Sequence, residues 1–221
     1  MPSSAERDRT QLIAATGAVL VRLDPAAQTS STVARLREVE SVTIPGGDGV
    51  TFRRGIIGSP ADGYGVAPDG RVAIVRASPY QVEWHAPDGR ITRGAAITPD
   101  PIPMTDDDKK AFEDRRRAAP SVSGTGGRGA SADLALRFAP VKPPFDPDDV
   151  RVAPDGRVWV RRSAAFGART AIYDVFDRTG ARVDRLEFDA ANHVVGFGIG
   201  TVLVREAAPG GGMTLKAFRT R

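Results

Sequence analysis

The sequence predicts an all-β protein built from a repeated antiparallel strand–turn–strand unit. Within the 221 residues, two segments nearly coincide, namely residues 66–76 (VAPDGRVAIVR) and residues 152–161 (VAPDGRVWVR). Shorter copies of the Gly-x-Val-x-Val-Arg core begin at Gly17 and Gly200. Repeats on this scale are typical of architectures that stack similar units. We therefore expect four related units.

The connector inside the units is the element Ala-Pro-Asp-Gly, which ends at Gly70, Gly89 and Gly156. Proline presets φ for the second position of a type I turn, aspartate suits the third position, and glycine takes the fourth. Residues 177–180 occupy the equivalent place after a strand over residues 171–176. Each unit is therefore expected to run strand, turn, inner strand, loop, strand, turn, strand.

The strands that follow these turns are apolar on both faces. Val158 and Val160 point one way while Trp159 points the other, and residues 202–204 repeat the pattern. Such strands are buried on two sides. The intervening stretches show alternating β patterns rather than helical periodicity, which favours small sheets stacked face to face, as the blades of a β-propeller are.

The spacing of the copies divides the chain into four parts. Gly156 and Gly200 are 44 residues apart, close to one four-stranded blade of roughly 40 to 50 residues. We expect a polar segment over residues 1–9, blades over residues 10–97, an insertion over residues 98–147 and further blades over residues 148–221. The architecture is therefore about four blades, an open or incomplete propeller, with one insertion.

The insertion is expected to hold one short helix and a Gly/Pro-rich loop. Residues 105–117 begin with Thr105 as N-cap, carry acids in the first turn and end in three arginines, each complementing the helix dipole. Residues 121–131 are rich in glycine and serine and predict a flexible loop. Residues 139–147 predict an extended return. The acidic residues 146, 148 and 149 are interpreted as a surface turn rather than a metal site.

Composition excludes several kinds of chemistry. The chain has no cysteine, so a disulfide, a thiolate metal site and a cysteine nucleophile are ruled out. Its 31 basic and 27 acidic residues leave a net charge of +4, and the arginines are scattered rather than gathered in one stripe. Nucleic acid is therefore a disfavoured partner. The polar start of the chain predicts that it has no signal peptide, and the lack of a long apolar run predicts that it has no membrane span.

Three stretches resemble bacterial six-bladed β-propellers related to the NHL-repeat and TolB-like groups: residues 155–162 (DGRVWVRR), 173–180 (YDVFDRTG) and 193–198 (HVVGFG). The resemblance covers roughly residues 10–221 and implies the fold but no particular activity. Four inner-strand signals fall short of six blades, so a partial propeller is expected, with upstream blades outside this chain. The resemblance then implies an extracytoplasmic location, and open blade edges imply self-association.

A ligand site is expected where strands give way to turns, because propeller loops are where ligands are usually met. The candidate residues at such positions are Trp84, His85, Asn192 and His193, and three further candidates are Tyr80, Arg161 and Arg162. Trp159, Phe176 and Phe197 are interpreted as packing residues. The Gly-x-Gly-x-x-Gly match at residues 124–129 lacks the flanking strand and helix of a dinucleotide site and is interpreted as part of the loop. No cofactor, metal or catalytic residue is predicted.

The favoured function is a non-enzymatic propeller module that binds or scaffolds a protein or small-molecule ligand. The first alternative is a metal-dependent lactonase or esterase, which would need several carboxylate or amide ligands converging from different blades. The second alternative is nucleic-acid binding through the arginine surplus, which strong salt-dependent retention on DNA would favour.

Overall fold

The computed structural model describes residues 11–13, 17–45, 51–118, 136–207 and 212–219, which form antiparallel β-sheets and one α-helix. The predicted all-β class is confirmed. The polar segment over residues 1–9, the Gly/Ser-rich loop over residues 121–131 and the glycine motif within it lie outside the described residues.

Two four-stranded sheets carry the predicted repeat. The first contains β6 (Gly63–Val66), β7 (Val72–Ala77), β8 (Tyr80–His85) and β9 (Ile91–Arg93). The second contains β10 (Phe145–Val152), β11 (Val158–Arg162), β12 (Thr170–Phe176) and β13 (Arg182–Asp189). In both, neighbouring strands are consecutive in sequence and antiparallel. The predicted order of strands and turns is therefore confirmed for these two units.

The predicted turns join these strands. The backbone N–H of Gly70 donates to the carbonyl of Ala67 at 2.9 Å, and Gly156 donates to Ala153 at 2.9 Å. Gly70 and Gly156 have φ values of 79° and 83°, in the left-handed region that glycine adopts without strain. The turn ending at Gly180 closes in the same way, at 3.1 Å.

The other two copies are shorter. The copy at Gly200 forms a three-stranded sheet of β14 (His193–Gly198), β15 (Thr201–Ala207) and β16 (Met213–Arg219). The copy at Gly17 forms a two-stranded sheet of β2 (Ala18–Asp24) and β3 (Thr29–Leu36). A separate sheet contains β1 (Gln11–Ile13), β4 (Ser41–Pro45) and β5 (Thr51–Gly55).

The first unit is therefore not the complete blade that the repeat predicted. After β3 the chain leaves the sheet, because backbone groups of residues 37–40 bond elsewhere. The N–H of Arg37 donates to the Asp62 carboxylate at 2.9 Å, and its carbonyl accepts from the N–H of Asp62 at 2.9 Å. The N–H of Glu40 donates to the Ser59 hydroxyl at 2.9 Å.

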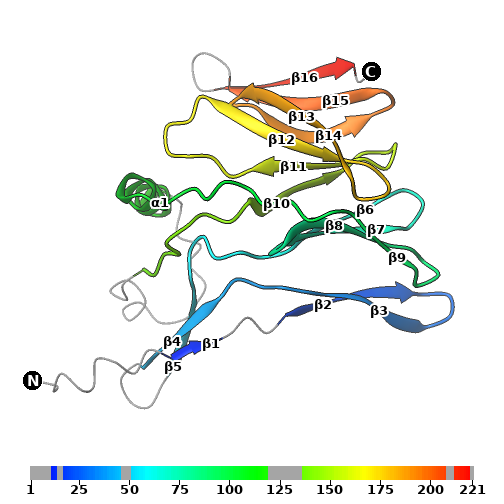
Figure 1. Cartoon of the computed structure of the whole chain (residues 1–221), viewed down its shortest axis with the longest axis horizontal. Helices are drawn as coiled ribbons and strands as arrows, with labels where there is room; N and C mark the ends of the chain where they lie inside the picture. The colour runs from blue at the N-terminus through cyan, green and yellow to red at the C-terminus, as the bar shows by residue number, and fades with distance from the viewer. Residues whose placement is uncertain (1–10, 14–16, 46–50, 119–135, 208–211, 220–221) are drawn as a thin grey trace, which may run out of the picture.

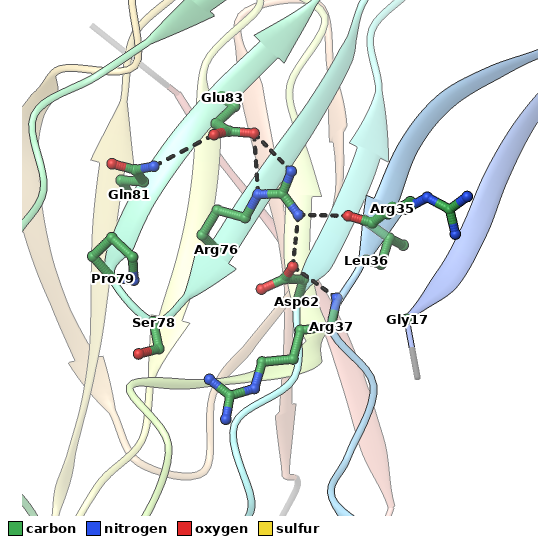
Figure 2. A pocket seen from close by; sticks show the side chains of 10 residues that line it. All are labelled: Gly17, Arg35, Leu36, Arg37, Asp62, Arg76, Ser78, Pro79, Gln81 and Glu83. Atoms are coloured by element: carbon green, nitrogen blue, oxygen red, sulfur yellow. Dashed lines mark hydrogen bonds and ion pairs between the residues drawn. The ribbon is translucent and has the colours of Figure 1, made fainter. Parts of the chain in front are cut away.

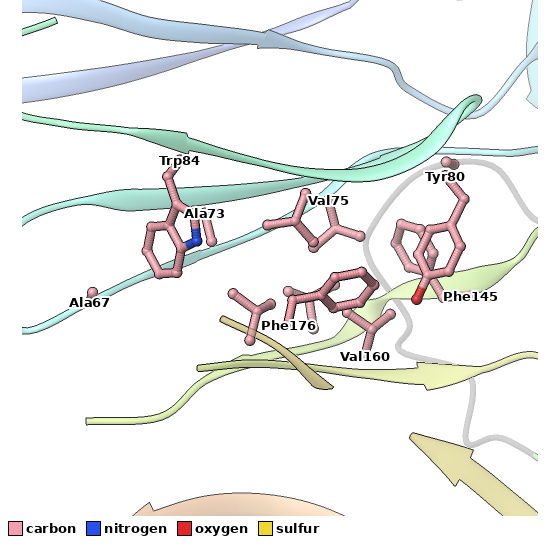
Figure 3. Close-up of a cluster of buried hydrophobic side chains, with 12 residues drawn as sticks. Ala67, Ala73, Val75, Tyr80, Trp84, Phe145, Val160 and Phe176 are labelled. Atoms are coloured by element: carbon pink, nitrogen blue, oxygen red, sulfur yellow. The ribbon is translucent and has the colours of Figure 1, made fainter. Parts of the chain in front are cut away.

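Four of the sheets stack face to face, from the β2–β3 sheet to the β14–β16 sheet (Figure 1). Between the two four-stranded sheets, Val75 and Trp84 pack toward Val160 and Phe176 (Figure 3). A second cluster, including Trp159, joins β11 and β12 to β14 and β15, and a third joins the β2–β3 sheet to β7.

The strands after the turns are buried on both faces, as predicted. Val158 and Val160 are fully buried on the side of the β6–β9 sheet, and Trp159 packs on the opposite side, with its ring centroid 5.5 Å from that of Phe197. Phe176 packs edge-on against Tyr80 with a centroid separation of 5.7 Å. The predicted packing roles of Trp159, Phe176 and Phe197 are confirmed.

The insertion contains the predicted helix, α1 (Asp106–Ala118). The Thr105 hydroxyl accepts from the N–H of Asp108 at 3.3 Å, and the Asp108 carboxylate accepts from the N–H of Thr105 at 3.0 Å, which is a reciprocal N-cap. Lys142 pairs with Asp108 at 2.6 Å and ties the helix to the returning chain. Within the described part of the chain, no helix combines the length and apolarity that crossing a membrane requires.

The insertion ends earlier than predicted, because β10 begins at Phe145 rather than at residue 148. The acidic residues Asp146, Asp148 and Asp149 therefore lie in a strand, and their interpretation as a surface turn was wrong. A shift of register between Phe145 and Val150 accommodates them. Such irregularities leave a residue unpaired within a strand, which sequence periodicity does not reveal.

Replacing Trp159 by alanine tests the inter-sheet packing. The indole is 5% exposed and contacts the rings of Tyr173 and Phe197, so Trp159→Ala should lower the free energy of unfolding by about 3–5 kcal/mol. Phe166→Ala is the control, because this ring is 53% exposed and its loss should change stability by about 0.5 kcal/mol or less. Urea unfolding followed by circular dichroism measures both. Equal losses in the two variants would contradict the stacking described above.

Candidate functional site

Among the described residues, the charged side chain with the lowest exposure is that of Asp174 on β12, which is fully buried. Three arginines surround its carboxylate: Arg162 on β11 at 3.1 Å, Arg185 on β13 at 3.3 Å and Arg182 on β13 at 3.5 Å. The hydroxyl of Tyr80, from the neighbouring sheet, also donates to this carboxylate at 3.1 Å. Both carboxylate oxygens are therefore engaged, as a buried charge requires.

The β6–β9 sheet holds the counterpart of this cluster. Glu83 on β8 is opposite Ile74, just as Asp174 on β12 is opposite Val160. Arg76, two residues beyond Ile74, makes two hydrogen bonds to Glu83 at 2.8 and 3.0 Å, and Arg93 on β9 pairs with Glu83 at 2.8 Å. Arg76 and Arg93 thus correspond to Arg162 and Arg185 in strand register.

The β14–β16 sheet carries the same diagonal pair with its charges exchanged. Lys216 on β16 is opposite Val204, and Glu206 lies two residues beyond Val204 on β15. The Lys216 ammonium is 2.5 Å from the Glu206 carboxylate. Val204 belongs to the cluster packed toward the preceding sheet. In each of three successive sheets, an ion pair therefore lies on the face turned to the preceding sheet.

The first cluster is balanced in charge. Arg76 also donates to Asp62 at 2.8 Å (Figure 2). Arg76 and Arg93 therefore share the two carboxylates of Asp62 and Glu83. Although burial opposes ionisation, hydrogen bonds from Arg93 and Arg76 lower the pKa of Glu83 below its usual value. A pocket of about 440 Å³ lies beside this cluster, and four of its lining residues bond one another through their side chains, namely Asp62, Arg76, Gln81 and Glu83.

The Asp174 cluster has more positive than negative charge, because three arginines share one buried carboxylate. The additional cation is Arg182, which is opposite Phe176, whereas the equivalent position in the first sheet is Ile91, opposite His85. These arginines line a pocket of about 340 Å³ between β11–β13 and the chain that follows β9. The other lining residues are Ile97, Thr98, Pro99, Asp100, Ile102, Ser163 and Ile172.

Three of the predicted site residues lie inside the fold rather than at an open loop. Tyr80 and Trp84 are 1% and 2% exposed, and each bonds the next sheet, Tyr80 through Asp174 and Trp84 through the carbonyl of Asp177 at 3.0 Å. Burial, followed by the nearby Asp174 charge, raises the pKa of Tyr80. His85 is buried 3.4 Å from Glu83.

The remaining predicted residues divide between two places. Arg162 belongs to the Asp174 cluster, with its guanidinium 5.1 Å from the centre of the Tyr80 ring. Arg161 points to the opposite side of β11, where it donates to the carbonyl of Ala190 at 2.9 Å. Near it, His193 pairs with Arg205 in strand register, and the Asn192 amide donates to Glu206 at 3.4 Å. The structure therefore brings Tyr80 and Arg162 together, but not all seven candidates.

The sequence interpretation missed Asp174, Arg182 and Arg185. One signal was available: an aspartate within the otherwise apolar run AIYDVF is unusual in a strand buried on both faces.

Among the residues that the structure describes, no group of three or more His, Cys, Asp or Glu side chains is placed to hold a metal ion.

Comparison with known proteins gives no relative: no family model, no curated protein and no solved structure matches this chain.

Removing the buried carboxylate tests its role in the fold. Asp174→Asn keeps the side-chain shape but leaves the 9%-exposed Arg162 without a counter-charge, so the free energy of unfolding should fall by about 3–5 kcal/mol. Asp155→Asn changes an exposed turn carboxylate and should cost about 0.5 kcal/mol or less. Chemical denaturation of both variants is the measurement. Near-equal stability of Asp174→Asn and the wild type would contradict a structural role for the cluster.

The environment of His193 predicts a dependence of stability on pH. Burial and the positive charges of Arg161 and Arg205 lower the pKa of His193 below its usual 6.5. The unfolded chain therefore binds this proton more readily, so stability should decline as the pH falls below 6.5 and level off below the folded-state pKa. His193→Gln should remove this part of the decline. Denaturation at several pH values compares the two proteins, and identical pH slopes would contradict the prediction.

Proposed function

We propose that the stacked sheets are blades of the β-propeller type and that the chain is a binding module rather than an enzyme. The observation that carries the proposal is the close approach of β6 and β10, the first strands of the two four-stranded sheets. Among strands of different sheets within the described residues, these two make the most extensive backbone contact. Propeller blades are likewise small antiparallel sheets arranged around a channel.

Glycines on β6 permit this approach. A Cβ atom at Gly63 would meet Val150 at 2.5 Å, and one at Gly65 would meet Val152 at 2.6 Å. Both valines belong to β10. Glycine within a strand often marks a place where another backbone approaches closely, so these two glycines support the convergence of the first strands.

The buried carboxylates support a binding role. Arginine side chains bond the carboxylates of Asp62, Glu83 and Asp174, and two strand N–H groups also donate to Asp62, so these carboxylates stabilise the sheet framework. Function then resides in pockets and surfaces that this rigid frame presents. Apolar side chains are also exposed at both ends of the stack, including Leu23 on β2 and Leu215 on β16. Self-association through these end sheets stays a prediction.

Metal content and hydrolytic turnover test the proposal. The purified protein should contain no stoichiometric divalent metal and should show no turnover of ester or lactone substrates. A stoichiometric metal together with turnover that a chelator abolishes would overturn it in favour of a propeller hydrolase. Elemental analysis and an assay with a panel of aryl esters and lactones provide the two measurements.

A further inference from the structure

We propose that the 340 Å³ pocket beside Asp174 binds a small molecule through a phosphate or carboxylate group. The proposal rests on the binding-module function above and names the class of its ligand. The occupant is a small anion rather than nucleic acid, because Arg162, Arg182 and Arg185 line one concave site of a size that suits small ligands, while the other arginines of the chain are scattered.

The pocket has an excess of positive charge. Arg162, Arg182 and Arg185 share the single buried carboxylate of Asp174, which leaves two positive charges in excess. The exposed side chain of Asp100 also lines the pocket and offsets one of them. The balanced cluster around Glu83 shows that this sheet design does not itself require an excess. The extra arginine is therefore free to serve a ligand.

The arginines are held so that some of their N–H groups are left for a ligand. Arg162 is held at the base of the pocket, because its Nε donates to the carbonyl of Pro144 at 2.9 Å and its Nη1 to Asp174 at 3.1 Å. Arg182 and Arg185 each approach Asp174 through one nitrogen, and their side chains are 37% and 49% exposed. Their other guanidinium N–H groups can therefore donate to a ligand oxygen, and guanidinium donors match phosphate and carboxylate geometry.

The rest of the lining provides hydroxyl groups and apolar surface. Ser163 and Thr98 can donate to the same kind of oxygen, while Ile97, Ile102 and Ile172 line the pocket with apolar surface. Small-molecule sites combine polar groups that orient the ligand with apolar side chains that contact the rest of it. The ligand is thus expected to combine an anionic group with an apolar portion.

Titration calorimetry at low ionic strength tests the site with two probes, inorganic phosphate and citrate. The wild type should bind at least one probe with a stoichiometry of one, and the better probe identifies the anionic group. Arg182→Gln and Arg185→Gln should each weaken binding about tenfold or more, since a charge-assisted hydrogen bond is lost. Asp100→Asn should strengthen binding, because it removes the opposing charge.

The matched control is Arg93→Gln. Arg93 pairs with Glu83 across the strands as Arg185 does with Asp174, and it is 60% exposed, but it lies outside the pocket. Its substitution should leave binding unchanged. Thermal unfolding confirms that each variant is folded. If an arginine variant does not fold, Asp100→Asn still tests the site, because it changes an exposed side chain.

Three results would overturn the proposal: neither probe binds the wild type, Arg93→Gln weakens binding as much as Arg182→Gln does, or Asp100→Asn leaves binding unchanged. Retention on duplex DNA with no binding of either probe would assign the arginines to nucleic acid instead. Each of these results leaves the metal and turnover measurements unaffected, so the module proposal stands or falls separately.

Discussion

The diagonal ion pair between neighbouring strands is the constraint on which the stacked sheets depend. Arg76 with Glu83 and Arg162 with Asp174 occupy the same register in two successive sheets, and both carboxylates are buried. A buried charge without its partner is far more costly than the pair is favourable. Slipping either strand by one residue would move its charged group to the opposite face. The pair therefore fixes which residues of each strand can face the preceding sheet, and the apolar clusters form on that register.

Hydrogen bonds between sheets add direction to the apolar contacts. Tyr80 and Trp84 each place an apolar ring in the shared core and a polar atom on a partner in the next sheet. The Tyr173 hydroxyl repeats this one sheet later by accepting from the N–H of Val194 at 3.0 Å. Aromatic residues with a polar end suit such positions, because burial of the ring and satisfaction of the polar atom are achieved together. The spacing between sheets is thereby fixed by specific bonds as well as by packing.

Much of the repeat could be predicted from local sequence, whereas the polar cluster could not. The Pro-Asp-Gly turns and the doubly buried strand at Trp159 depend on neighbouring residues, and both predictions are confirmed. Asp174 has partners on two neighbouring strands, β11 and β13, and in Tyr80, which is 94 residues away, so no local pattern marks the cluster. Trp84 was expected to border a ligand loop because it lies where a strand gives way to a turn, but the neighbouring sheet covers it and Tyr80 as well. The incomplete first unit depends on backbone bonds between Arg37 and Asp62, which strand periodicity does not report.

The repeated placement of the ion pair on one face gives the stack a polarity. Each internal sheet has the diagonal pair on one face only, and the Arg161–Asp149 contact on the opposite face of the β10–β13 sheet is longer, at 3.9 Å, so the two sides of a sheet are not interchangeable. An additional sheet of the same design can extend the series only in the head-to-tail sense, as the β14–β16 sheet follows the β10–β13 sheet. A sheet added in reverse would set two faces with the diagonal pair, or two without it, against each other. Duplication of the unit can therefore extend the stack in one orientation only. The exchanged charges of Glu206 and Lys216 show that the position of the pair is more constrained than the sign of each partner.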